Sequence, residues 1–110
     1  MALPHARSLQ VVSLAPPGAA LESTVSHAIL KAGQLEAMRL VLRAGEQMQQ
    51  HDAPGEATLQ CLEGEVLLEL PGRQETLRPG DWLHLPPRVH VTLRARQPSS
   101  LLLTICLLAG

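Results

Sequence analysis

The chain has 110 residues, and nine Lys and Arg against ten Asp and Glu give it a formal net charge of −1. This balance, without any run of basic residues, argues against nucleic acid and anionic membrane surfaces as partners. Hydrophobic residues make up 45% of the chain but aromatic residues only 1%, so the sequence predicts one domain, residues 1–110, with an aliphatic core.

The cysteines and the apolar runs bear on the compartment. Cys61 and Cys106 each sit inside an apolar run and form no disulfide framework, which is typical of buried thiols in a reducing compartment. No run reaches the roughly 18–20 apolar residues of a membrane span. The first twenty residues are interrupted by Gln10 and Ser13 and do not resemble a signal peptide. We therefore expect a cytoplasmic protein.

Short apolar runs separated by Pro and Gly recur along the whole chain, a pattern that favours an all-β sandwich or barrel. The predicted strands are, in chain order, Leu9 to Ala15, His27 to Lys31, Leu35 to Arg43, Ala57 to Leu62, Glu65 to Leu70, Gln74 to Leu77, Trp82 to Leu85, Val89 to Arg94 and Leu101 to Leu108.

One segment near the N-terminus has two interpretations. Leu21, Val25 and Ile29 recur at every fourth position, so residues 19–30 form either a short amphipathic helix or part of the strand pattern, and the strand is preferred. The run from Ser100 to Leu108 is apolar on both faces, which suits a strand covered on both sides.

Two segments with regular spacing carry three of the five histidines, namely His51, His84 and His90. Gly45 is followed after five residues by His51-Asp52-Ala53, then after three by Ala57 and after six by Gly64. Gly80-Asp81 is followed after four residues by Pro86 and after four more by Val91. Over residues 35–108, about two-thirds of the chain, these spacings resemble the two motifs of the cupin superfamily, in particular its small, single-domain, RmlC-like members.

The resemblance implies a cupin double-stranded β-helix, which is a jelly-roll sandwich or barrel, with a motif core at 35–108 and an N-terminal arm at 1–34. It also implies a metal site of three histidines and one glutamate. At these positions the sequence has His51 followed by Ala53, Ala57 and Val91, which carry no donor atoms. Because one imidazole does not make a divalent-metal site, we expect no metal and no cofactor.

Strand side chains alternate with a period of two, and this predicts the walls of a pocket. His51 and Ala53 share one face with Gln49, a second face carries Ala57, Leu59 and Cys61, and Val91 forms a third wall. The predicted ligand-binding pocket therefore consists of Gln49, His51, Ala53, Ala57, Leu59, Cys61 and Val91.

The other histidines leave an alternative. His84 alternates with Trp82, and the sequence does not decide which face of that strand is inward. If His84 is inward, then His51, His84 and His90 are the candidate metal ligands; otherwise His84 and His90 lie outside. His5 and His27 lie beyond the motifs and are expected at the surface.

Three functions follow from these residues. The preferred one is a metal-free cupin that binds a small apolar or aromatic ligand in an aliphatic pocket, with His51 as the convergent polar group. The alternatives are a metal-dependent enzyme of the dioxygenase type and a structural or interaction module with a vestigial pocket, so whether the chain is an enzyme stays open. The catalytic residues are unknown. The exposed edges of a small sandwich also predict a homodimer, with residues 19–43 as the main contributor.

Overall fold

The computed structural model describes residues 5–15, 18, 21, 24–50 and 53–108. Within these ranges the chain forms β1 (His27–Lys31), β2 (Leu35–Leu42), β3 (Gln47–Gln50), β4 (Ala57–Glu63), β5 (Val66–Leu70), β6 (Arg73–Leu77), β7 (Trp82–Leu85), β8 (Val91–Ala95) and β9 (Ser99–Cys106). The all-β prediction is confirmed. In the described part of the chain, no helix is long and apolar enough to cross a membrane.

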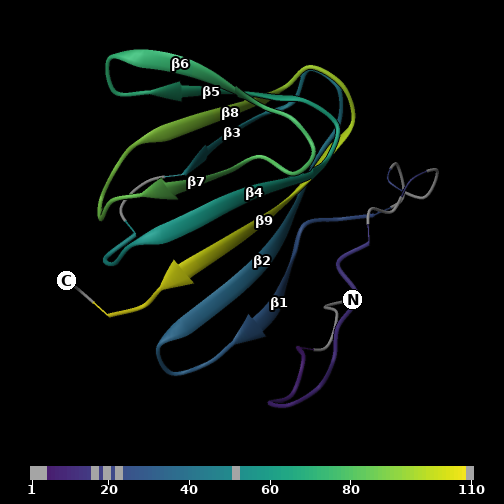
Figure 1. Ribbon diagram of the computed structural model, residues 1–110, viewed down its shortest axis with the longest axis vertical. Coiled ribbons are helices and arrows are strands. Elements are labelled where there is room, and N and C mark those ends of the chain that lie inside the picture. The colour runs from purple at the N-terminus through teal and green to yellow at the C-terminus, as the bar shows by residue number, and fades with distance from the viewer. Residues whose placement is uncertain (1–4, 16–17, 19–20, 22–23, 51–52, 109–110) are drawn as a thin grey trace.

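The strands form two antiparallel sheets that lie against each other (Figure 1). One sheet has the order β1-β2-β9-β4-β7 and the other the order β3-β8-β5-β6. Apart from the pairs β1-β2 and β5-β6, strands that follow each other in the sequence lie in different sheets, so the chain crosses repeatedly from one layer to the other, as in a jelly roll. This connectivity brings β4 and β8, which carry most of the predicted pocket residues, into opposite walls of one interior.

The alternation of side chains explains the core. On β4, Leu59 and Cys61 are 1% and 0% exposed, whereas Thr58 and Gln60, which precede them, are only partly buried. On β9, Leu101, Leu103 and Ile105 are buried, and the residue that follows each of them is less buried. These inward rows meet in one aliphatic cluster, so burial of apolar surface from both sheets is the main stabilising contribution.

The predicted strands agree closely with the observed ones from His27 onward. β1 and β7 have the predicted bounds, and the other predicted strands of this region differ from the observed ones by one or two residues at one or both ends. The sequence analysis missed β3, because Gln47-Met48-Gln49-Gln50 has little strand character of its own. Pairing with β8 makes it a strand, since Met48 lies opposite Leu93 and packs against the core.

The predicted strand from Leu9 to Ala15 is wrong. This segment has no regular secondary structure, and Leu9 has a left-handed backbone with φ of 68° in a tight turn. The turn is closed by two bonds between Arg7 and Gln10, so the segment folds on itself and does not extend along a sheet edge. Residues 19–20 and 22–23 of the helix alternative lie outside the described residues, and residues 27–30 are strand.

Two glycines of the cupin spacing occupy the turns that the motif requires. Gly64 follows β4 and Gly80 precedes β7, and each has φ of +91°. L-residues rarely adopt this conformation, which glycine reaches without steric cost. The backbone conformation at these two positions therefore agrees with the spacing of the cupin motifs.

Candidate functional site

The predicted pocket residues of β4 and β8 face the interior between the sheets. Ala57 is 6% exposed and Val91 is 2% exposed, and both belong to the core cluster. Leu59 and Cys61 continue the same wall deeper into the core. The interior that these residues line is therefore aliphatic, apart from one thiol.

One end of this interior is built by loops. The N–H of Arg88 donates to the carbonyl of Ala53 over 3.0 Å, which ties the loop before β8 to the loop before β4. Arg88 has a left-handed backbone with φ of 59°, a strained conformation that this hydrogen bond helps to hold. Ala53, Val89 and Leu107 are partly buried and pack against the core here. We call these three side chains the rim.

The loop before β4 comes very close to the end of β9 at Gly55. Gly55 is buried, and a Cβ atom at this position would collide with the carbonyls of Cys106 and Leu108. The N–H of Cys106 also donates to the carbonyl of Glu56 over 2.8 Å. The loop before β4 is thus fixed against the end of β9, which keeps Ala53 at the end of the interior.

The polar members of the predicted pocket are Gln49 and His51. Gln49 is exposed and lies opposite Thr92, and its neighbour Met48 is the side chain that faces the core, so the structure places Gln49 away from the interior. His51 lies outside the described residues, and so does Asp52. The role of His51 as the polar group of the pocket stays a prediction.

The question left open for β7 is decided by burial. Leu85 is 4% exposed and belongs to the core, whereas Trp82 is 59% exposed. His84 shares the outer face with Trp82, and its Nε2 lies 2.7 Å from Oε1 of Glu56. Both partners are solvent-exposed, so this pair contributes little to stability.

The alternative metal site therefore loses His84, which points away from the interior. His90 is exposed in the loop before β8, while the adjacent Val91 is buried. Within the described ranges, no three His, Cys, Asp or Glu residues lie together so as to hold a metal ion. Ala53, Ala57 and Val91 have no donor atoms to offer, so the residues present do not fit the metal that the cupin motif implies.

Cys61 is the one ionisable side chain in the inner wall. Burial is the main reason that the pKa of its thiol lies above the ordinary value, and the charge of Asp81 adds to the effect. A hydrogen bond from Sγ to the carbonyl of Glu63 acts in the opposite direction but is weaker. The thiol is therefore neutral at physiological pH and behaves as an apolar filler.

Comparison with solved structures identifies the architecture. A cupin superfamily protein from Desulfitobacterium hafniense superimposes with a TM-score of 0.70 at 17% identity, over 74% of this chain and 75% of that one. A conserved protein of unknown function from Streptococcus pyogenes gives 0.72 at 15% identity over 100% and 97% of the two chains. The chain has the cupin fold.

The resemblance noted in the sequence is thus confirmed at the level of the fold. A mutant of salicylate 1,2-dioxygenase from Pseudoaminobacter salicylatoxidans also matches, with a TM-score of 0.61 and 25% identity over 66% of this chain and 21% of that enzyme. This chain therefore corresponds to only a part of the dioxygenase. No protein-family model matches the sequence, and no curated protein matches it either.

Proposed function

We propose that this cupin binds a small apolar or aromatic molecule at the rim end of its interior, without a metal. The observation that carries the proposal is the replacement of donor atoms by aliphatic groups at inward positions. Ala57 and Val91 occupy motif positions that are metal ligands in the resemblance, and both face the core. An aliphatic lining of this kind favours an apolar ligand by removing its surface from water.

The rim supplies the place for such a ligand. Ala53, Val89 and Leu107 are partly buried, in contrast to the inner wall, so they retain apolar surface that a bound molecule covers. Their loops are held by backbone hydrogen bonds, which lowers the entropic cost of binding. We further propose that His51 orients the ligand by one hydrogen bond.

A thermal-shift screen with small neutral aromatic and aliphatic molecules tests the proposal. A ligand present at about a hundred times its Kd stabilises the native state by about 2.7 kcal/mol. For a domain of this size, this corresponds to a rise in Tm of roughly 10 °C. If no compound of the screen raises Tm, the proposal is wrong and the chain is better described as a module with a vestigial pocket.

Matched variants locate the binding. Ala53→Leu narrows the rim and is expected to abolish the shift, and His51→Ala is expected to weaken binding more than it lowers stability. Ala44→Leu is the control, because Ala44 is exposed in the turn before β3 and lies away from the rim. The N–H of the next residue, Gly45, donates to the carbonyl of Ala95, which is at the end of β8 opposite the rim. Elemental analysis of protein purified without a histidine tag completes the test, and near-stoichiometric metal would contradict the metal-free part of the proposal.

A further inference from the structure

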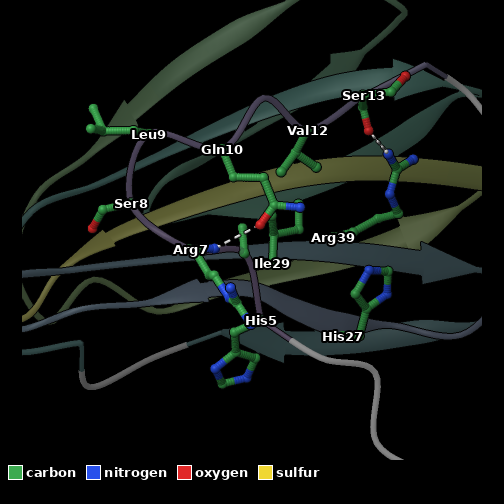
Figure 2. Close-up of a pocket in the computed structure, with 11 residues that line it drawn as sticks. His5, Arg7, Ser8, Leu9, Gln10, Val12, Ser13, His27, Ile29 and Arg39 are labelled. Carbon is green, nitrogen blue, oxygen red and sulfur yellow. Dashed lines mark hydrogen bonds between the residues drawn. The ribbon is translucent and has the colours of Figure 1, made fainter.

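A second candidate site lies outside the barrel, between the N-terminal arm and the outer face of the five-stranded sheet. The arm passes over β1 and β2 and is attached where the N–H of Ala6 donates to the carbonyl of Ile29 over 2.7 Å. Beneath it is a cavity of about 670 Å³, which we call the arm cavity (Figure 2). It is lined by His5, Ala6, Arg7, Ser8, Leu9, Gln10, Val12, Ser13, His27, Ile29 and Arg39.

The charge of this lining differs from that of the whole chain. Acidic residues slightly outnumber basic ones overall, ten to nine. Among the described residues, however, the arm cavity is lined by two arginines and two histidines and by no aspartate or glutamate. The two arginines, with no carboxylate among the described lining residues, favour an anion.

Arg39 is the central group. It lies on the outer face of β2 and is only 8% exposed, although arginine is almost never buried without a partner. In the described part of the chain its guanidinium donates to the carbonyls of Ser13 and Ala15, both at 3.5 Å, which is the long limit for a hydrogen bond. A guanidinium presents five N–H donors in a planar fork, a geometry that suits an anionic head group.

The neighbours of Arg39 supply further polar atoms. His27 lies directly opposite Arg39 in the pairing of β1 with β2. Its Nδ1 is 2.9 Å from the carbonyl of Val25 and must donate, because a carbonyl only accepts. Gln10 accepts from the N–H of Arg7 with its Oε1, which leaves the amide nitrogen on the side of Arg39 (Figure 2). Since the Nδ1 proton of His27 is used on Val25, the N–H donors that face this space are those of Gln10 from the arm and Arg39 from the sheet.

An apolar compartment adjoins the arm cavity. It has a volume of about 340 Å³ and shares the arm residues from Ala6 to Gln10, together with Val12 and Ile29. Its remaining lining is aliphatic and consists of Leu14, Leu30, Ala32, Ala37 and Leu102. A cationic compartment that continues into an aliphatic one fits a molecule with an anionic head and a hydrocarbon tail.

We propose that the arm cavity binds an aliphatic carboxylate, with the head at Arg39 and the tail in the apolar compartment beside Ala37. Burial of the tail adds about 0.8 kcal/mol for each CH₂ group that leaves water, while the fork of the guanidinium fixes the head. This site is separate from the rim, since it lies on the opposite side of the five-stranded sheet.

Calorimetric titration with octanoate, acetate and 1-octanol tests the inference. Octanoate carries both parts of the ligand, acetate only the head and 1-octanol only the tail. We expect octanoate to bind at least tenfold more tightly than either of the others. Equal affinity for octanoate and 1-octanol would overturn the role of the cationic groups, and equal affinity for octanoate and acetate would overturn the role of the apolar compartment.

Variants test each part of the site. Arg39→Met keeps an apolar stem and should weaken octanoate binding at least tenfold, whereas Arg73→Met, on the exposed face of β6, should leave it unchanged. Because Arg39 also holds the arm, Arg7→Met at the exposed end of the cavity provides a second charge variant. Ala37→Leu should weaken octanoate but not acetate, and Ala44→Leu should affect neither.

The same titration separates this site from the proposed function. Ala53→Leu alters the rim and should leave octanoate binding intact. If Ala53→Leu abolishes it and Arg39→Met does not, octanoate occupies the barrel and the inference about the arm cavity is wrong. Loss of octanoate binding in Arg39→Met, with no response of the protein to neutral ligands, would support the arm cavity and contradict the rim site.

Discussion

Alanine substitutions at Gly64 and Gly80 separate two costs of adding a Cβ atom, namely backbone strain and steric collision. Both have φ of +91°, so alanine at either position meets the same left-handed strain, which costs about 1–2 kcal/mol. A Cβ atom at Gly80 would have nothing within 4 Å. A Cβ atom at Gly64 would collide with the hydroxyl of Ser99 and the carbonyl of Pro98, and would lie 2.7 Å from the Cα of Ser99.

The collision at Gly64 has two further consequences. The surroundings must move, because the contacts are with backbone and with a fully buried side chain, and such overpacking costs about 1–3 kcal/mol. The hydroxyl of Ser99 accepts a hydrogen bond from the N–H of Glu65 over 3.1 Å, and displacing it leaves that donor without its partner, which adds roughly 1 kcal/mol. We therefore expect Gly64→Ala to destabilise the protein by about 3–6 kcal/mol and Gly80→Ala by about 1–2 kcal/mol.

Urea denaturation followed by far-UV circular dichroism measures both free energies of unfolding. At roughly 4 °C or more per kcal/mol, the two variants should differ in Tm by about 10 °C. Equal destabilisation would show that the approach of Gly64 to Ser99 is absent, and no destabilisation of either variant would refute the positive φ angles. Ser99→Ala in the Gly64→Ala background should restore little, because the carbonyl of Pro98 stays in place.

Three further predictions address the core, the motif and the assembly. Cys61 should react with a thiol reagent only on unfolding, whereas the partly exposed Cys106 should react in the native protein. Burial also raises the pKa of the Cys61 thiol in the folded protein. The free energy of unfolding should therefore fall as pH rises above the ordinary pKa of 9.0, where the thiol of the unfolded chain ionises first. Reaction of two thiols in the native state would contradict this. The triple change Ala53→His, Ala57→Glu and Val91→His should create a metal site with His51 and raise Tm in added Ni²⁺ or Zn²⁺, and the absence of any metal-dependent shift would mean that the motif positions are misassigned. Light scattering at micromolar concentration should show a homodimer formed mainly through residues 19–43, and a monomeric mass would contradict it.

The sequence by itself determined the fold and most of the inner wall. The spacing of Gly64, Gly80 and Pro86 marks turns, and turns set strand lengths, so the cupin frame could be read from local signals. Alternation of apolar residues then placed Ala57, Leu59 and Val91 on inward faces, because the period of a strand is independent of its partners. Ala53, Ala57 and Val91, at the ligand positions of the motif, predicted that the donor atoms of a cupin metal site are missing.

Only the tertiary structure decided what lies on the outer faces. The alternation of Trp82 and His84 is compatible with either orientation, and burial of Leu85 against the opposite sheet selects the outward one. The strand at Gln47–Gln50 depends on pairing with β8, a long-range contact that leaves no local signal in a run of polar residues. The segment around Leu9 is apolar enough to predict a strand, but a turn and the contact of Arg39 with Ser13 and Ala15 draw it across the sheet. The arm cavity arises in this way from residues far apart in the sequence, since the side chains of Arg7, His27 and Arg39 meet only when the arm packs on β1 and β2.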